Sequence, residues 1–261
     1  MTLIDTHTHL YVSQFDKDRN EVIKNAINSG ITKMILPGIN STYINLQNQL
    51  AKTYFSNCYS AFGLHPCDVK EGFKEELKCV EIELKKGNAI AVGEIGIDLY
   101  WDKTFVKEQK IAFKQQIIWA KEYKLPIIIH VRESFNEVFE IIDKLNDENL
   151  TGVFHSFTGN IEQANKIINY KGFKIGINGI VTFKNSGLDK VVKEIPLQQI
   201  VLETDSPYLS PVPKRGKINE SSYLIYIANK ISEIKEISVE KIAEITNKNA
   251  KEIFGEKMSL P

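Results

Sequence analysis

The sequence has no net charge, few cysteines and no long apolar run. Its 261 residues include 33 basic and 33 acidic side chains, whereas proteins that grip duplex DNA through many phosphates are usually basic. Any contact with nucleic acid is therefore expected to be local to an active site. The three cysteines, Cys58, Cys67 and Cys79, form no CxxC pair, which favours reduced thiols in a cytosolic protein.

Signals for export and for membrane insertion are also lacking. The N-terminus has no basic segment followed by an apolar stretch, so we expect no signal peptide. No apolar run approaches the roughly 18 residues that a membrane span needs. The sequence therefore predicts a cytoplasmic protein without a membrane association and indicates no obligate protein partner.

The composition is that of an ordinary globular protein, with 43% apolar and 25% charged residues. A chain of 261 residues suits either one large α/β barrel or two smaller domains. We find no internal repeat, low-complexity stretch or linker. We therefore expect one domain, residues 1–261.

Strand-like and helix-like segments alternate along the chain. Short apolar runs predict strands buried on both faces, at 2–6, 32–37, 58–63, 89–94, 126–130, 151–155, 173–177 and 199–203. Helical spacing occurs between them at 21–27, 109–123, 134–145 and 161–168. Eight strands with intervening helices predict an α/β fold, the closed (β/α)8 or TIM barrel.

Two further segments read as extra C-terminal helices. They are residues 220–234 and 238–254, the second with Ser238 as its N-cap and Gly255 at its end. Within the earlier helix 109–123, a mixed apolar stripe is expected to face the core. It comprises Ile111, Ala112, Gln115, Ile118, Trp119 and Glu122.

All five histidines lie where a predicted strand runs into a loop. They are His7, His9, His65, His130 and His155. His7 and His9 are two residues apart, so both imidazoles can face one side of a strand and bind one ion. Taken alone, such a pair can also arise by chance or pack in a core, and the same holds for His130 and His155.

Two carboxylates occupy the same kind of position as the histidines. Glu94 follows an apolar run, and Asp205 follows the last predicted strand. A buried glutamate can instead pair with a basic residue, and an aspartate can cap a turn. Barrel active sites are built at the C-terminal ends of the strands, so the joint placement favours a metal site over coincidence.

Six segments together resemble the TatD-family metal-dependent deoxyribonucleases, a branch of the amidohydrolase-type barrels. They are Leu3–His9, Gly63–Pro66, Gly93–Asp98, Pro126–Arg132, His155–Gly159 and Glu203–Leu209, in the family's order and over nearly the whole chain. The resemblance continues through Asn249-Ala250 and Phe254-Gly255.

The resemblance implies two divalent metal ions, Mg²⁺, Mn²⁺ or Zn²⁺. His7, His9, Glu94 and Asp205 would surround one ion. Glu94 would bridge to a second ion held by His130 and His155. Four neutral imidazoles and two carboxylates with two divalent ions leave a charge of roughly +2, which favours an anionic phosphodiester over a neutral amide.

Catalytic and substrate-binding roles are assigned around these ligands. Asp205 is the candidate proton acceptor from the attacking water. His65 is placed near the scissile phosphate, as a donor or general acid. Arg132 could fork to a phosphate, or alternatively pair with Glu133 or Glu94.

Residues outside the ligand set form a wider ring of candidates. Glu203 could orient a ligand histidine. The segment 211–217 could bind phosphate through its three basic residues or simply be solvated. Five loop aromatics could stack single-stranded bases or belong to the core: Tyr100, Trp101, Phe157, Phe183 and Tyr208.

The sequence departs from the family pattern at three positions. Family members commonly have an acidic residue where Asn136 stands, and an arginine and a proline where Ile218 and Ser221 stand. The missing arginine weakens the basic loop and bears on substrate affinity rather than on metal binding.

The expected function is metal-dependent hydrolysis of phosphodiester bonds, as a 3′-5′ exodeoxyribonuclease on single-stranded DNA or oligonucleotides. One alternative within enzymes is hydrolysis of a small ester, amide or aminoacyl-tRNA linkage. Another, from a different class, is a catalytically idle binding protein on a barrel scaffold.

Overall fold

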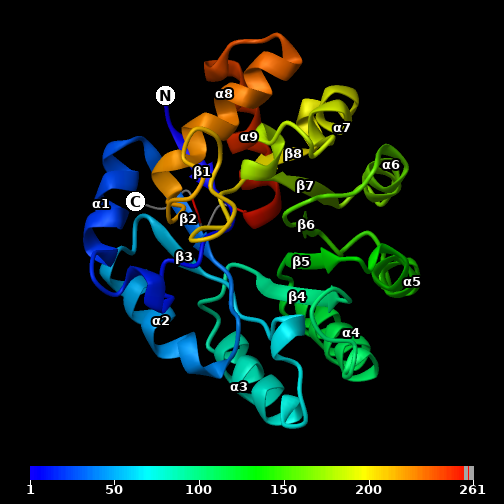
Figure 1. Ribbon diagram of the computed structural model, residues 1–261. Helices are drawn as coiled ribbons and strands as arrows, with labels where there is room; N and C mark the ends of the chain where they lie inside the picture. The colour runs from blue at the N-terminus through cyan, green and yellow to red at the C-terminus, as the bar shows by residue number, and fades with distance from the viewer. Residues whose placement is uncertain (256–257, 259–261) are drawn as a thin grey trace.

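Eight short parallel strands form the centre of the computed structural model, which describes residues 1–255 and 258 (Figure 1). The strands are β1 (Leu3–Asp5), β2 (Ile31–Leu36), β3 (Cys58–Ser60), β4 (Val92–Asp98), β5 (Ile127–Arg132), β6 (Gly152–Phe154), β7 (Phe173–Ile177) and β8 (Ile200–Leu202). Regular pairing links neighbouring strands into two runs. The first run has the order β1-β2-β3, and the second has the order β4-β5-β6-β7-β8.

Backbone hydrogen bonds close both gaps between these two runs. Between β8 and β1, Thr6 N donates to Leu202 O at 3.0 Å, and Asp205 N donates to His7 O at 2.9 Å. Between β3 and β4, Gly93 N donates to Phe62 O at 2.9 Å. The strands therefore form a closed ring, and the predicted TIM-barrel fold is confirmed.

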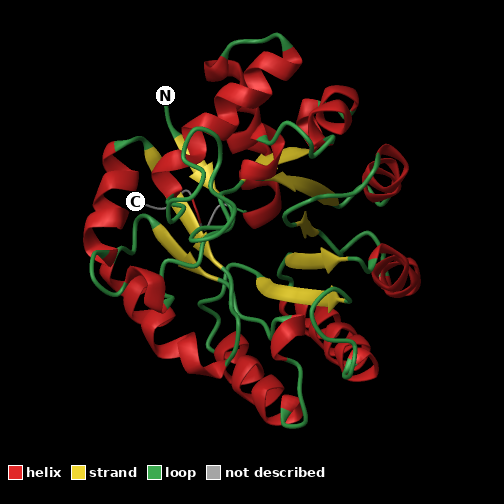
Figure 2. Ribbon diagram, in the orientation of Figure 1, coloured by secondary structure: helices red, strands yellow, loops and turns green. Residues whose placement is uncertain are grey.

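All helices but the last surround the strands in chain order, as Figures 1 and 2 show. They are α1 (Arg19–Asn28), α2 (Ile44–Thr53), α3 (Phe73–Lys85), α4 (Val106–Tyr123), α5 (Phe135–Leu145), α6 (Ile161–Asn169), α7 (Leu188–Glu194), α8 (Leu224–Lys235) and α9 (Val239–Phe254). The two predicted C-terminal helices are present: α8 follows β8, and α9 comes after it. Ser238 caps α9 by accepting a hydrogen bond from Lys241 N, and Gly255 ends it.

The fourth strand differs from its prediction. Residues 89–94 were expected, but β4 spans Val92–Asp98 because its pairing with β5 continues to Asp98 opposite Arg132. The register also shifts between Val92 and Ile95, as in a β-bulge, which adds one residue to β4 relative to β5. The bulge lets both Val92 and Ile95 face the helices while Glu94 turns into the barrel.

The close approach of β4 and β5 needs glycine at position 96. Gly96 has φ +149°, and a Cβ atom there would collide with the backbone carbonyl of His130. The pairing of β4 with β5 continues beyond His130 to Arg132, so His130 is the fourth residue of the six-residue β5 rather than its last. The prediction that every candidate ligand lies at the end of a strand is wrong for Glu94 and His130.

The barrel interior is filled by small and branched side chains, and α9 packs against them. Inward-facing residues such as Ile4, Ile35 and Ile128 join Ala250 and Phe254 of α9 in one buried cluster. The outward-facing residues of the strands belong to a second, larger cluster beneath the surrounding helices. The alternation of inward and outward residues is the period of two that strand geometry imposes.

The predicted stripe on α4 is wrong in part. Ile111 and Ile118 are 54% and 49% exposed, whereas Phe113 and Ile117 are buried. The predicted stripe lies one residue away from the face that packs on the barrel.

Among the described residues, no helix is long and apolar enough to cross a membrane. The predicted single domain, residues 1–261, extends over residues 256, 257 and 259–261, which lie outside the described part of the chain.

Phe254→Ala is expected to lower the free energy of unfolding by about 3 kcal/mol, because it leaves a cavity between α9 and the barrel. Phe254 is 3% exposed. Phe55→Ala is the matched control, since Phe55 is 68% exposed and should change stability by less than about 0.5 kcal/mol. Urea denaturation measures both. Equal effects in the two variants would contradict a packed role for α9.

Candidate metal centre

The first group of polar atoms in the barrel mouth lies around one oxygen of Glu94. His7 Nε2 is 3.1 Å from Glu94 Oε2 and 3.1 Å from His9 Nε2. His9 Nε2 lies 3.6 Å from Glu94 Oε2 and 3.6 Å from Asp205 Oδ1. Two atoms bonded to one ion at about 2.1 Å are about 3.0–3.4 Å apart for angles between 90° and tetrahedral. The two 3.1 Å distances fit this range and the two 3.6 Å distances exceed it by 0.2 Å, so these residues have the donor types, and nearly the spacing, to hold one ion.

The second group lies around the other oxygen of Glu94. His130 Nδ1 is 2.8 Å from Glu94 Oε1, His65 Nε2 is 3.4 Å from it, and His155 Nε2 is 3.8 Å from it. His155 Nε2 also lies 3.7 Å from Asp205 Oδ1. Two sets of possible ligands, His7–His9–Glu94 and His65–Glu94–His130, therefore share this one carboxylate.

All the ion pairs of Glu94 within the described residues are with histidines, so the alternative of a buried lysine or arginine partner does not hold. The Glu94 side chain is 3% exposed. Burial alone would raise the pKa of Glu94, but the imidazoles of His65, His7 and His155 hold it well below its usual range. Glu94 is thus a carboxylate whose two oxygens face separate clusters of nitrogen.

Asp5 fixes the ends of β1 and β8 next to this centre. One oxygen of Asp5 accepts hydrogen bonds from Thr204 N and His7 N, at 2.9 and 3.3 Å. The other accepts from Thr204 Oγ1 at 2.7 Å. Asp205 then follows with φ +58° and donates its N–H to His7 O. This network sets Asp205 opposite His7 and His9, which follow β1.

Outer contacts fix the orientation of two more histidines. Tyr11 donates its hydroxyl hydrogen to Pro37 O, so its oxygen is left to accept from His9 Nδ1 at 2.8 Å. His155 Nδ1 lies 3.0 Å from Glu203 Oε1, which confirms that Glu203 contacts a predicted ligand histidine. Because the outer nitrogen of His9 has a hydrogen-bond partner and that of His155 faces a carboxylate, the inner nitrogens of both rings are available at the centre.

Asp98 orients His130 in the same way. Its Oδ2 accepts a hydrogen bond from His130 Nε2 at 2.9 Å, while His130 Nδ1 faces Glu94. Burial opposes protonation of His130, but hydrogen bonds to Asp98 and Glu94 raise the pKa of His130 to about 9. The metal-free centre therefore holds a proton on His130 that a metal ion has to displace.

The other buried histidines favour the neutral form that metal ligation requires. Burial, with His155 nearby, lowers the pKa of His7 to about 4. Burial, with His7 nearby, lowers the pKa of His9 well below its usual value, and burial also lowers that of His155. Burial raises the pKa of Asp205 to about 7, so its carboxyl can exchange a proton near neutral pH.

The structure brings the six predicted metal ligands, and His65 with them, into one cluster. The sequence interpretation missed Asp98 and Tyr11. The period of two offers a signal for Asp98, which is four residues after Glu94 on β4, but none for Tyr11, which lies in a turn after β1. His65, His130 and Asp205 have side chains that are 15%, 16% and 14% exposed, whereas His7 is fully buried. Solvent thus reaches the centre past those three side chains.

The structure decides between the two alternatives for only one of the loop aromatics. Phe157 is 2% exposed, so it belongs to the core and does not stack bases. Phe183 carries the Arg215 guanidinium over its ring at 4.1 Å. Tyr100, Trp101 and Tyr208 are exposed. Ser221, at one of the family departures, is buried and donates to Thr8 Oγ1 at 3.3 Å.

The alternative partners proposed for Arg132 are wrong: in the described part of the chain, its guanidinium makes no ion pair with Glu133 or Glu94. It lies instead over the Tyr100 ring, 4.2 Å from the centroid. Its use as a phosphate ligand stays a prediction.

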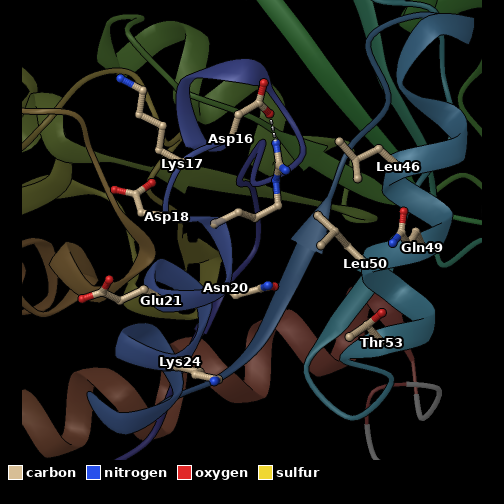
Figure 3. Close-up of a pocket in the computed structure, with 11 residues that line it drawn as sticks. Asp16, Lys17, Asp18, Asn20, Glu21, Lys24, Leu46, Gln49, Leu50 and Thr53 are labelled. Carbon is tan, nitrogen blue, oxygen red and sulfur yellow. Dashed lines mark hydrogen bonds and ion pairs between the residues drawn. The ribbon is translucent and has the colours of Figure 1, made fainter.

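A separate surface cavity of about 580 Å³ lies between α1 and α2 (Figure 3). Its charged lining is balanced, and Arg19 in its wall already donates to Leu10 O, Tyr11 O and Val12 O and pairs with Asp16. We assign no function to this cavity.

Comparison with known proteins agrees with this geometry. The family model for TatD related DNases matches residues 4–255. The metal-dependent hydrolase YabD of Bacillus subtilis (strain 168) is 40% identical over 253 residues, 97% of this chain and 98% of the relative. The 3′-5′ ssDNA/RNA exonuclease TatD of Citrobacter koseri is 30% identical over 259 residues, 97% of this chain and 99% of the relative.

Among solved structures, YJJV, a TatD homologue from Escherichia coli K12, matches with a TM-score of 0.91 and 27% identity, over 99% of this chain and 98% of that one. The barrel, the histidine–carboxylate cluster and these relatives define a metal-dependent hydrolase. The chain belongs to the TatD related DNase family.

Asp98→Asn is expected to weaken metal binding by about 10- to 100-fold, because His130 loses the carboxylate that orients it. Asp102→Asn is the matched control: its carboxylate lies on the exposed loop after β4 and accepts from Thr104 N. Competition with a fluorescent chelator measures both affinities. An unchanged affinity in Asp98→Asn would show that Asp98 does not support the centre.

The metal-free protein is expected to lose stability between about pH 6.5 and 9. The pKa of His130 is raised from 6.5 to about 9, so the folded state holds a proton that the unfolded state has released in this window. The stabilisation is complete below pH 6.5 and disappears as pH rises through 9. Thermal unfolding in chelator measures it.

His130→Asn serves as the control for this pH dependence, and it should show a smaller loss over the same window. Added metal should flatten the wild-type profile, because the ion replaces the proton. A rise in stability toward pH 9, or the same loss in the variant, would contradict the assignment.

Proposed function

We propose that this chain hydrolyses phosphodiester bonds of single-stranded DNA or oligonucleotides from the 3′ end, in the cytoplasm. The observation that carries the proposal is that two clusters of histidines share the carboxylate of Glu94, one cluster at each oxygen. The relatives described as 3′-5′ ssDNA/RNA exonucleases, in Citrobacter koseri and Pantoea ananatis, are 30% and 28% identical to this chain and support the same activity.

Two divalent ions, Mg²⁺, Mn²⁺ or Zn²⁺, would occupy the two groups. His7, His9, Glu94 and Asp205 would hold one ion, and Glu94, His130 and His155 the other. Bound there, divalent ions would activate a water molecule and offset the negative charge of a phosphodiester. The residues themselves contribute about −2 when the imidazoles are neutral, so the loaded centre retains positive charge for an anionic substrate.

Asp205 is the proposed proton acceptor. Its Oδ1 lies 3.6 Å from His9 Nε2 and 3.7 Å from His155 Nε2, so it reaches the space between both groups. The raised pKa of Asp205, about 7 in the metal-free protein, suits a group that takes up a proton at neutral pH. The bound proton can then leave through the side of the centre that solvent reaches.

His65 is proposed to act on the phosphate. Its Nδ1 accepts from Cys67 N at 3.1 Å, which leaves Nε2 as the nitrogen that can carry the proton. Nε2 faces Glu94 and His130, at 3.4 and 3.2 Å, on the solvent-accessible side of the centre. There it can donate to a phosphate oxygen or to the leaving group. Arg132 is the proposed guanidinium ligand for a neighbouring phosphate.

Single strands labelled at the 3′ or the 5′ end, digested with each metal in turn, test the proposed function. Stepwise release of a 3′ label, with shortening of 5′-labelled strands by one nucleotide at a time, is expected. A panel of small esters, amides and aminoacyl-tRNA should be poor substrates. Turnover confined to that panel, or loss of the 5′ end first, would overturn the proposal.

Glu94→Ala is expected to reduce hydrolysis by at least about 100-fold and to lower the amount of bound metal, because both groups lose their shared carboxylate. Glu83→Ala is the matched control: Glu83 is a buried glutamate that pairs with Lys86 in the α3 region. Oligonucleotide digestion and elemental analysis give the two readouts. Full activity in Glu94→Ala would refute the bridging role.

A further inference from the structure

An arginine and two aromatic rings lie together at the rim of the barrel, beside the metal centre. The Arg132 guanidinium is 4.2 Å from the centroid of the Tyr100 ring and 5.4 Å from that of Trp101. Trp101 is 68% exposed and Tyr100 is 49% exposed. Aromatic rings and arginine are enriched at binding surfaces relative to the rest of a protein surface, so a cluster of two exposed rings and a guanidinium is a candidate contact for a ligand.

The cluster of Tyr100, Trp101 and Arg132 is tied to the metal centre through Asp98. Asp98 Oδ1 accepts hydrogen bonds from Tyr100 N at 2.9 Å and from Trp101 N at 3.0 Å. The other oxygen of the same carboxylate holds His130 Nε2 at 2.9 Å. One side chain therefore positions both a candidate metal ligand and the backbone of the aromatic pair.

Arg132 is also anchored at the level of its backbone. It pairs with Asp98 in the β4–β5 register, and its carbonyl accepts from Leu99 N at 2.9 Å. Within the described residues its guanidinium has ring contacts but no ion pair or hydrogen bond, so its N–H donors remain available to a ligand. A planar guanidinium can rest on a ring and still donate to a phosphate from its edge.

Trp101 lies near the loop that carries His65. It borders a small hollow with Pro66 and Cys67, the two residues that follow His65. The rings thus lie between the His65 loop and the end of β5, next to the part of the centre that solvent reaches.

We propose that Trp101, Tyr100 and Arg132 form a subsite for one unpaired nucleotide, a proposal that rests on the proposed function. The Trp101 face stacks a base, Tyr100 supports the guanidinium, and Arg132 donates to the phosphate of that nucleotide. Stacking reads no sequence and requires a base that is free of its neighbours, so the subsite selects unpaired nucleotides over the stacked bases inside a duplex. It adds to the affinity that phosphate contacts supply to a chain without net charge.

Two strands of equal length and charge separate base stacking from phosphate contact: an oligothymidylate, and a strand in which every base is replaced by an abasic spacer. Anisotropy of a labelled strand measures binding in chelator, where no hydrolysis occurs. The wild type is expected to bind the thymidylate strand about 10-fold more tightly than the abasic strand. Trp101→Ala should lose most of that preference.

Phe55→Ala is the matched control, because Phe55 is as exposed as Trp101, at 68%, and precedes β3 at the opposite end of the barrel. It should retain the wild-type preference. Arg132→Gln should weaken both strands alike and lower the salt dependence of binding. Trp101 is one of two tryptophans, and Trp119 is 7% exposed, so quenching of the wild-type emission by the thymidylate strand gives a second readout.

The subsite is overturned if Trp101→Ala discriminates between the strands as the wild type does, or if the wild type does not discriminate at all. Hydrolysis of labelled single strands by the same wild-type sample would show that the proposed function stands even then. Loss of base preference in Trp101→Ala, with hydrolysis intact in Phe55→Ala, supports the subsite. Preference for the thymidylate strand without hydrolysis under any metal would count against the nuclease and still support the subsite.

Discussion

The arrangement of the barrel mouth depends on one carboxylate that faces two groups of imidazoles. Glu94 is almost fully buried, and its oxygens lie 3.1 Å from His7 Nε2 and 2.8 Å from His130 Nδ1. A buried charge is costly unless it is compensated, and the only ionisable groups paired with it in the described chain are histidines. His130 carries one proton there, whereas His7, His9 and His155 favour the neutral form, so the centre is suited to cations and the family's metal dependence agrees with this local chemistry.

The strands around Glu94 are shaped to deliver that carboxylate and its partners. The bulge between Val92 and Ile95 turns Glu94 inward, and the glycine at position 96 lets β5 approach closely enough for His130 to face it. Asp5 joins the ends of β1 and β8, which sets Asp205 opposite His7. At the far end, α9 packs on the inward-facing residues of the barrel. The polar mouth is therefore supported on an apolar layer beneath it.

The sequence predicts the strand order and the gathering of the five histidines well, because both follow from short-range patterns: apolar runs, and polar residues placed after them. It predicts poorly what depends on contacts between segments that are distant in the sequence. The limits of β4 are set by pairing with β5, the exposed position of Ile111 is set by how α4 rotates on the barrel, and the burial of Phe157 is set by its neighbours. Asp98 was missed because its role depends on His130, which is distant in sequence.

Anomalous scattering from a crystal loaded with Mn²⁺ tests the shared role of Glu94 most directly. The account predicts two peaks, one on each side of Glu94, with His7 and His9 next to the first peak and His130 and His155 next to the second. Glu94 should contact both peaks, one through each oxygen. A fully loaded protein with no peak in contact with Glu94, or with metal bound only outside the barrel mouth, would contradict the account.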